Sequence, residues 1–222
     1  MPRALIALCL ALQAVPARFT AASVLERASQ PLPAGRRAFE IRSEGRVVGS
    51  GTWLVEGARH HVAFRNPLGQ PTAILRIADG AVGLELVGDR EIVEADAGVS
   101  LGDLVGGLDA SALPTLLWGR LPDAPVAMRP VGAGFVATHP GFVAGLDREG
   151  EVRVASVGDW HLTRRADGVV LTDGDLALRL VLGGVVEGPV PEGAFRVGTE
   201  ERVPSISTHR VGQLARRRLL GL

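Results

Sequence analysis

From residue 37 to residue 95 the sequence is a run of short segments with alternating apolar residues, each followed at once by a tight turn. Glu44-Gly45, Glu56-Gly57 and Asp79-Gly80 are typical turn pairs. Strands joined by turns this short form hairpins, so the sheet is predicted to be antiparallel. The predicted strands span 37–43, 47–55, 58–65, 72–78, 82–87 and 90–94.

A helical insert follows this meander at 100–118, where apolar residues recur at helical spacing and Ser100 can cap the start. A shorter helix is predicted at Ala21–Ser29. Strands return at 134–138, 142–147, 151–157, 159–165, 168–172, 175–182 and 193–197. The pattern predicts a mainly β fold: an incomplete antiparallel β-barrel of about 11 strands, with short helices forming a lid over an apolar cavity.

Size and charge exclude several classes of function. A chain of 222 residues with 46% hydrophobic content can bury one core, so a single domain at 18–200 is expected. The 24 basic and 24 acidic residues cancel, so no overall field attracts nucleic acid. Aromatic residues make up only 4%, with no Tyr, which disfavours an integral outer-membrane barrel with aromatic girdles. A monomer is expected.

Both ends of the sequence differ from this domain. Residues 1–17 combine Arg3 with an apolar run and small residues near Ala17, which predicts a Sec-type secretory signal peptide; the alternative is a buried N-terminal helix. Cys9 lies inside that run, and a lipid anchor there is a less favoured alternative because Leu8 precedes it. Residues 201–222 form an Arg-rich tail with helical spacing, which could lie on anionic lipid or pack locally.

No pattern in the sequence indicates catalysis, a cofactor or a metal. Gly132–Ala137 resembles a dinucleotide fingerprint, but a turn follows it where a helix is required. His60 and His61 are adjacent on a strand and therefore point to opposite faces. Ser50 lies within a strand rather than on a nucleophile elbow. The chain is predicted not to be an enzyme.

One turn carries an unexpected apolar residue. Asn66-Pro67-Leu68-Gly69 fits a type I turn between two strands, with Leu68 at its tip. A leucine held in water by a stiff turn gains nothing in the free protein, so it is either covered by the fold or available to an apolar partner.

Four motifs follow one another within roughly Phe39–Pro122: Gly51–Gly57 with Trp53, Phe64–Gly69, Glu94-Ala95-Asp96 and Trp118–Pro122. In this order and spacing they resemble the LolB family of outer-membrane lipoprotein receptors, within the LolA/LolB lipoprotein-localisation superfamily. Pro191–Val197 resembles a closing strand of LolA-like domains. The family is normally anchored by an N-terminal lipid, and this chain departs from it in lacking a lipobox.

The resemblance implies a carrier at the periplasmic face of the outer membrane or in the periplasm. It would accept the acyl chains of lipoproteins from a periplasmic LolA-like carrier and deliver them to the inner leaflet of the outer membrane. The turn Pro67, Leu68 and Gly69 would be the membrane-insertion loop. Strand alternation places Phe39, Ile41, Trp53, Val55, Val62, Phe64, Ile74 and Leu84 in the acyl-chain cavity, under a lid that contains Leu104, Val105, Leu108 and Leu117. The alternative is a structural or general lipid-binding envelope protein with a LolA-like fold.

Overall fold

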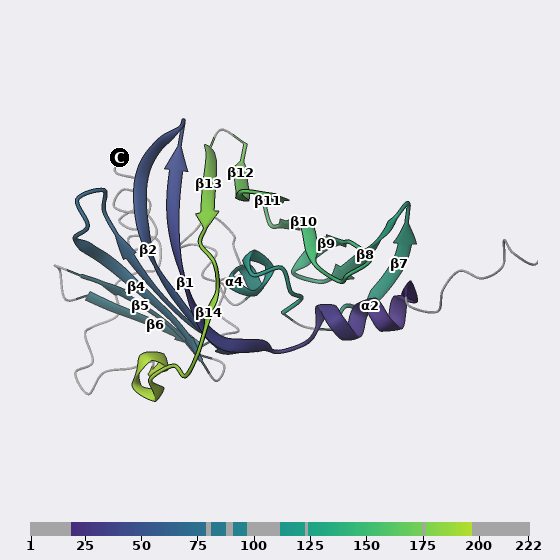
Figure 1. Cartoon of the computed structure of the whole chain (residues 1–222), viewed down its shortest axis with the longest axis horizontal. Helices are drawn as coiled ribbons and strands as arrows, with labels where there is room; N and C mark the ends of the chain where they lie inside the picture. Colours follow the sequence, from purple (N-terminus) through teal and green to yellow (C-terminus); the bar gives the residue numbers. More distant parts are fainter. Residues whose placement is uncertain are drawn as a thin grey trace, which may run out of the picture.

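A computed structural model describes residues 19–78, 81–87, 91–96, 112–122, 124–174 and 176–196. The predicted signal peptide with Cys9, the first part of the helical insert and the C-terminal tail lie outside these residues. Figure 1 shows the described chain as one strongly curved sheet with a few short helices.

The sheet consists of two antiparallel meanders, as the short turns predicted. The first runs through β1 (Leu32–Ser43), β2 (Arg46–Gly57), β3 (Arg59–Arg65), β4 (Pro71–Ala78), β5 (Ala81–Leu86) and β6 (Glu91–Asp96). The second runs through β7 (Ala127–Val131), β8 (Gly134–His139), β9 (Phe142–Leu146), β10 (Val152–Val157), β11 (Trp160–Arg165), β12 (Gly168–Asp173) and β13 (Leu176–Leu182).

The last strand of the second meander joins the first strand of the first. β13 pairs antiparallel with β1, from Phe39 opposite Leu182 to Ser43 opposite Leu178. The short β14 (Val186–Glu187) continues along β1. The sheet therefore runs from β6 at one edge to β7 at the other, and these two edges do not pair in the described structure. This confirms a mainly β, open antiparallel sheet, with fourteen strands among the described residues rather than about eleven.

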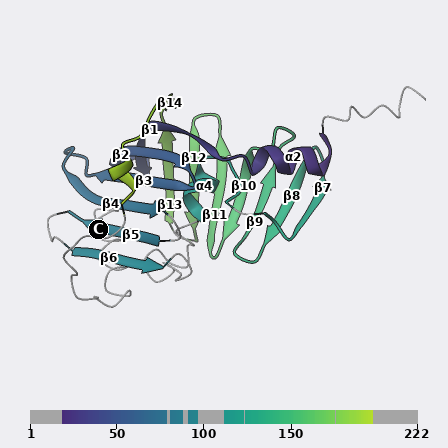
Figure 2. The ribbon, with the colours of Figure 1, turned by 90° about the horizontal axis from the view of Figure 1, so that it is seen from below.

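Two α-helices lie on the inner side of the curve (Figures 1 and 2). Helix α2 (Ala21–Ala28) is capped by Thr20, whose side-chain oxygen accepts from the Ser23 N–H at 3.2 Å. It lies near β7 to β10 and buries Val24 and Ala28. Helix α4 (Ala112–Leu117) belongs to the predicted insert, in the connection that leads from one edge of the sheet to the other.

Three predictions of local structure were wrong. Strand β1 begins at Leu32 rather than at residue 37 as predicted, because Pro33 is tolerated near a strand start. Residues 192–195 form a 3-10 helix, η2 (Glu192–Phe195), instead of a closing strand, since Pro191 fixes the backbone and Gly193 and Ala194 have low strand propensity. Strand β7 was missed because it contains Pro130, which suits only an edge.

The core follows the face of the sheet that α4 contacts, here called the inner face. It carries Phe39, Trp53 and Val62 from the first meander and Phe142, Trp160 and Leu162 from the second, together with Leu116 and Leu117 of α4. The opposite, outer face of β3 and β4 contacts η2, where the Ala194 carbonyl oxygen lies 2.7 Å from His61 Nδ1.

Candidate functional site

Helix α4 contacts two strands that are far apart in the sheet. His60 of β3 lies 3.1 Å from Thr115 of α4, measured from Nε2 to Oγ1, and Arg164 of β11 contacts the C-terminal residue of the helix, Leu117. The strands β2, β1, β13 and β12 lie between β3 and β11 in the sheet. Only a sheet curved around the helix allows both contacts, so α4 covers the middle of the inner face.

A buried hydrogen-bond chain from Trp53 through His60 holds α4 at Thr115. The Trp53 indole N–H donates to His60 Nδ1 at 3.2 Å, which leaves the proton on Nε2 facing the Thr115 hydroxyl. The His60 side chain is 0% exposed, and burial lowers its pKa to about 4. His60 is therefore neutral at physiological pH and holds one tautomer.

Arg164 holds the C-terminal end of α4. Its Nη2 donates to the backbone oxygens of Leu116 at 3.3 Å and Leu117 at 2.6 Å, and its Nε donates to Val152 at 3.0 Å. The carbonyls of Leu116 and Leu117 are among those that a helix end leaves without intrahelical partners. The Arg164 side chain is only 9% exposed, and burial lowers its pKa, with an opposing contribution from Glu151. His60 and Arg164 therefore hold the second half of α4 against the sheet, from Thr115 to Leu117.

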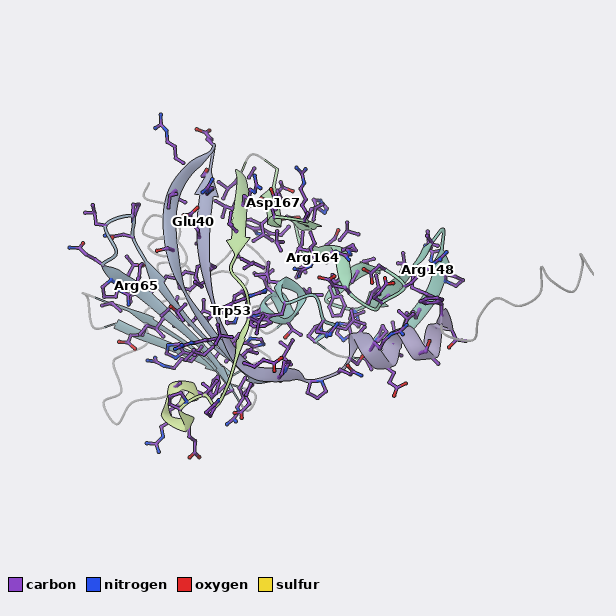
Figure 3. The ribbon with its side chains drawn as sticks, in the orientation of Figure 1. Glu40, Trp53, Arg65, Arg148, Arg164 and Asp167 are labelled. Atoms are coloured by element: carbon purple, nitrogen blue, oxygen red, sulfur yellow. The ribbon has the colours of Figure 1, made fainter. Side chains whose placement is uncertain are left out.

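Aromatic rings pack beside α4 on the inner face, and Figure 3 labels one of them, Trp53. The Trp118 ring lies edge-on to Trp53 at 5.8 Å between centroids, and Trp53 packs edge-on against Phe39 at 6.4 Å. Arg37 of β1 places its guanidinium over the Trp118 ring, 4.4 Å from the centroid. The motif residues Trp53 and Trp118 therefore meet in the structure, although they lie far apart in the sequence.

Most of the residues predicted to line the cavity share the inner face. Trp53 opposes Val62, and Phe39 opposes Gly51, which in turn opposes Phe64. Val55 opposes His60, and Leu84 opposes Leu75 of β4. Ile41 is buried in the same core. Phe39, Ile41, Trp53, Val55, Val62 and Leu84 are buried, and Phe64 is half-buried.

Ile74 is the exception, and its prediction was wrong. It opposes Ala63, which opposes the exposed Thr52, so it lies on the outer face. Leu75, which opposes Val62, takes the inner position. Because Ala73, Ile74 and Leu75 are all apolar, alternation alone could not choose between the two faces.

The predicted lid is described only at its end. Leu117 lies in α4 and is 5% exposed, in the same core as Trp53. Leu104, Val105 and Leu108 lie outside the described residues. The sequence did not predict the roles of His60, Thr115 and Arg164 in holding α4. The alternation of His60, Val62 and Phe64 could have placed His60 on the inner face, but no local signal indicates its contact with α4.

The predicted membrane-insertion loop is a rigid turn with Leu68 in solvent. The Gly69 N–H donates to the Asn66 carbonyl at 2.9 Å, and Gly69 has a φ of 79°. The Asn66 side-chain oxygen accepts from the N–H groups of Leu68 and Gln70, each at 3.0 Å. Leu68 is 82% exposed. Pro67 and Gly69 therefore frame a leucine that the described fold does not cover.

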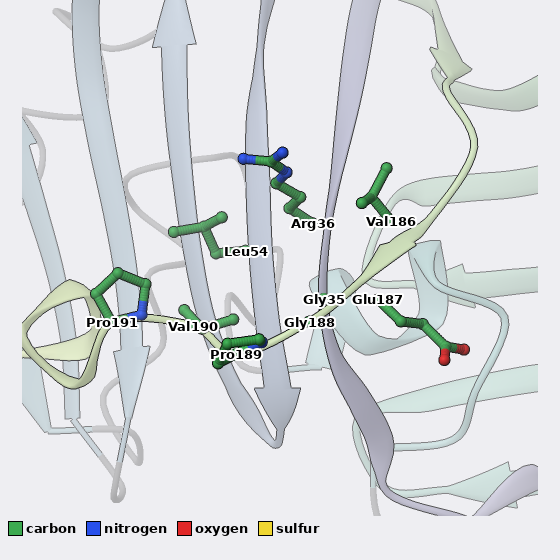
Figure 4. A pocket seen from close by; sticks show the side chains of 9 residues that line it. All are labelled: Gly35, Arg36, Leu54, Val186, Glu187, Gly188, Pro189, Val190 and Pro191. Atoms are coloured by element: carbon green, nitrogen blue, oxygen red, sulfur yellow. The ribbon is translucent and has the colours of Figure 1, made fainter.

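A hollow of about 300 Å³ lies on the outer face, where the chain after β13 crosses β1 and β2 (Figure 4). Arg36 and Leu54 contribute from the sheet. Its remaining lining residues are Gly35, Val186, Glu187, Gly188, Pro189, Val190 and Pro191.

The described residues contain neither a metal-binding cluster nor a membrane-spanning helix. No group of three or more His, Cys, Asp or Glu side chains is arranged to hold a metal ion in that part of the chain. None of the described helices has the length and apolarity that crossing a bilayer requires.

Comparisons with known proteins found structural likenesses only. No family model and no curated protein matches the chain. It is similar to a LolA superfamily protein from Nitrosomonas europaea, with a TM-score of 0.46 and 10% identity over 80% of this chain and 98% of that one. It is also similar to a DUF1329 family protein from Desulfovibrio piger, with a TM-score of 0.49 and 10% identity over 82% and 99%.

Proposed function

We propose that this protein is a carrier that holds the acyl chains of lipoproteins against the inner face of its sheet and helps to insert them into the outer membrane. The observation that carries the proposal is the exposed Leu68, held on a turn that Asn66 fixes. This turn joins β3 and β4, two strands that contribute apolar side chains to the inner face. The sequence resemblance to lipoprotein receptors assigns membrane insertion to the same turn.

The energetics of acyl transfer suit a protein without catalysis. Removing a methylene from water gains about 0.8 kcal/mol, so a chain of about sixteen carbons gains on the order of 12 kcal/mol. Such a chain cannot leave one membrane for another at a useful rate unless an apolar surface shields it on the way. The inner face offers apolar side chains from both meanders. Delivery then requires only an acceptor that binds the chain better.

The partners and location follow from the same proposal. The donor is a periplasmic LolA-like carrier, the cargo is an acylated lipoprotein, and the acceptor is the inner leaflet of the outer membrane. The protein works in the cell envelope, in the periplasm or at the periplasmic face of the outer membrane.

Uptake and delivery can be measured separately. The purified protein is expected to bind a fluorescent fatty acid and to transfer it, or an acylated lipoprotein, to phospholipid vesicles. Leu68→Glu is expected to slow transfer while leaving uptake unchanged, because the charge opposes entry of the turn into lipid. Val126→Glu is the matched control, since Val126 is 73% exposed and precedes the edge strand β7. Equal transfer by wild type and both variants would refute the role of Leu68.

A second function is favoured by the hydrogen bonds that hold α4. A helix held to the sheet at Thr115 and at Leu117 suits a structural envelope protein with a filled core, or one that binds lipid without delivering it. A protein of the first kind would take up no apolar probe. One of the second kind would bind the fatty acid but show no transfer to vesicles.

A further inference from the structure

Arg37 is a cation on the inner face without an acidic partner among the described residues. It opposes Trp53 across β1 and β2, and is therefore on the same face as the aromatic cluster. The described salt bridges join seven pairs, and Arg37 belongs to none of them. A charge held at an apolar surface is costly unless an opposite charge or hydrogen bonds compensate it.

The acidic side chain that acts electrostatically on Arg37, Glu151, is already engaged. Glu151 contacts Arg164 Nε at 3.3 Å through Oε1 and Arg153 Nη2 at 3.0 Å through Oε2. Burial lowers the pKa of Arg37, and the positive charge of Arg164 lowers it further, while Glu151 acts in the opposite direction. The surroundings of Arg37 therefore contain excess positive charge.

Two side chains in contact here each carry a buried N–H donor without an acceptor in the described structure. Arg37 Nε and Trp118 Nε1 are both buried and have no hydrogen-bond partner in the described structure. The guanidinium of Arg37 lies over the ring of Trp118, so the two side chains are in contact. A buried donor without an acceptor costs about 1–3 kcal/mol. An anionic oxygen bound here would satisfy the donors and balance the charge.

We infer that Arg37 and Trp118 bind the anionic head of an amphiphile, a carboxylate or a phosphate, whose acyl chain lies along the inner face. The inference rests on the proposed function and narrows its ligand class to anionic lipids. A guanidinium is suited to this role because its planar fork matches the oxygens of carboxylate and phosphate. The apolar residues beside it, Phe39, Trp53 and Val62, would contact the first part of the chain.

The test compares lipids that differ only in the charge of the head. Palmitic acid and its methyl ester compete with a fluorescent fatty acid for the wild-type protein, at a pH where the carboxylate is ionised. The acid is expected to bind at least about tenfold more tightly, because only its ionised head can accept charge-assisted hydrogen bonds from the guanidinium. In Arg37→Met the preference should disappear, while affinity for the ester stays within about twofold of wild type.

The neighbouring arginine provides the matched control. Arg36 lies on the same strand but lines the hollow of the outer face, so Arg36→Met should keep the preference for the acid. Arg37→Lys should keep part of it, because the charge remains and the fork is lost. If Arg37→Met does not fold, the inference is still tested by two measurements: the affinity of the wild-type protein for the acid relative to the ester, and the same comparison in Arg37→Lys.

Each outcome separates the inference from the proposed function. Equal binding of acid and ester by the wild type overturns the inference and leaves the proposed function standing. Binding of neither lipid overturns both. Inorganic phosphate tests whether the site binds a free anion. If phosphate displaces the probe as effectively as a phospholipid with the same head group, the site binds small anions without the acyl chain, and the inference is wrong.

Discussion

His60 Nε2 and Thr115 Oγ1 lie 3.1 Å apart and join the sheet to helix α4. Because Trp53 donates to Nδ1 of the same ring, His60 must donate from Nε2. A protonated His60 would lose the bond from Trp53, since Nδ1 could no longer accept. The hydrogen bond between Trp53 and His60 therefore depends on His60 remaining neutral, whereas Nε2 can donate to Thr115 in either protonation state.

This dependence predicts a loss of stability in mild acid. The pKa of His60 is about 4 in the folded protein and about 6.5 in the unfolded chain, so only the unfolded state gains the proton between these values. Stability is full above pH 6.5 and falls by on the order of 3 kcal/mol as the pH is lowered towards 4. Urea unfolding of wild type and His60→Gln across this range measures the effect. The variant should lose less stability than wild type. His161→Gln, at an exposed position of β11, should behave as wild type.

Replacing Arg164 should loosen the C-terminal end of α4. Arg164→Met removes the donor to the carbonyls of Leu116, Leu117 and Val152, and should lower the free energy of unfolding by about 3 kcal/mol. Arg153→Met is the control, because Arg153 binds the same Glu151 but its side chain is 50% exposed; it should cost less than about 1 kcal/mol. Similar losses in both variants, measured by chemical denaturation, would contradict a special role for Arg164.

Gly51 allows Phe39 to pack flat against the sheet. A Cβ at Gly51 would overlap the Phe39 ring and the carbonyl oxygen of Ala63. Gly51→Ala should therefore lower the free energy of unfolding by about 1–3 kcal/mol, the usual cost of overpacking. At Gly184 a Cβ would meet no atom within 4 Å, so Gly184→Ala should be close to neutral. Thermal melts of the two alanine variants give the comparison.

Asn66 should matter for delivery more than for ligand binding. Asn66→Ala removes the oxygen that accepts from Leu68 and Gln70, and should cost about 1 kcal/mol of stability. Because Leu68 is then no longer held in one position, transfer of a fluorescent fatty acid to vesicles should slow while uptake is retained. Gln70→Ala, which removes only the side-chain contact to Asn66 Nδ2, should transfer almost normally. Unchanged transfer by Asn66→Ala would show that the turn need not be rigid.

Local patterns predicted the parts of the fold that neighbouring residues determine. The turn at Asn66 and the hairpins on either side of it follow from residues within a few positions of one another, and they were confirmed. The exposed position of Leu68 followed from the same turn. The inner-face positions of Trp53, Val62 and Phe64 followed from strict alternation along β2 and β3.

The parts that could not be predicted depend on distant contacts or on ambiguous patterns. Ile74 lies in an apolar run that fits either face, and only the register with Ala63 decides. The contacts of α4 with His60 and Arg164 depend on the curvature of the whole sheet, which no local pattern specifies. The unpaired state of Arg37 likewise becomes visible only when Glu151 is seen to bind two other arginines.

The pairing of β1 with β13 sets the order in which this protein can mature. During synthesis β1 emerges early, but the strand that completes its hydrogen bonding comes only after both meanders have been made. Contacts between such distant segments slow folding and leave open edges that can aggregate. Protection of the nascent chain must therefore continue until β13 is available. A chain truncated before β13 would leave β1 as an unpaired edge strand that can bind other chains.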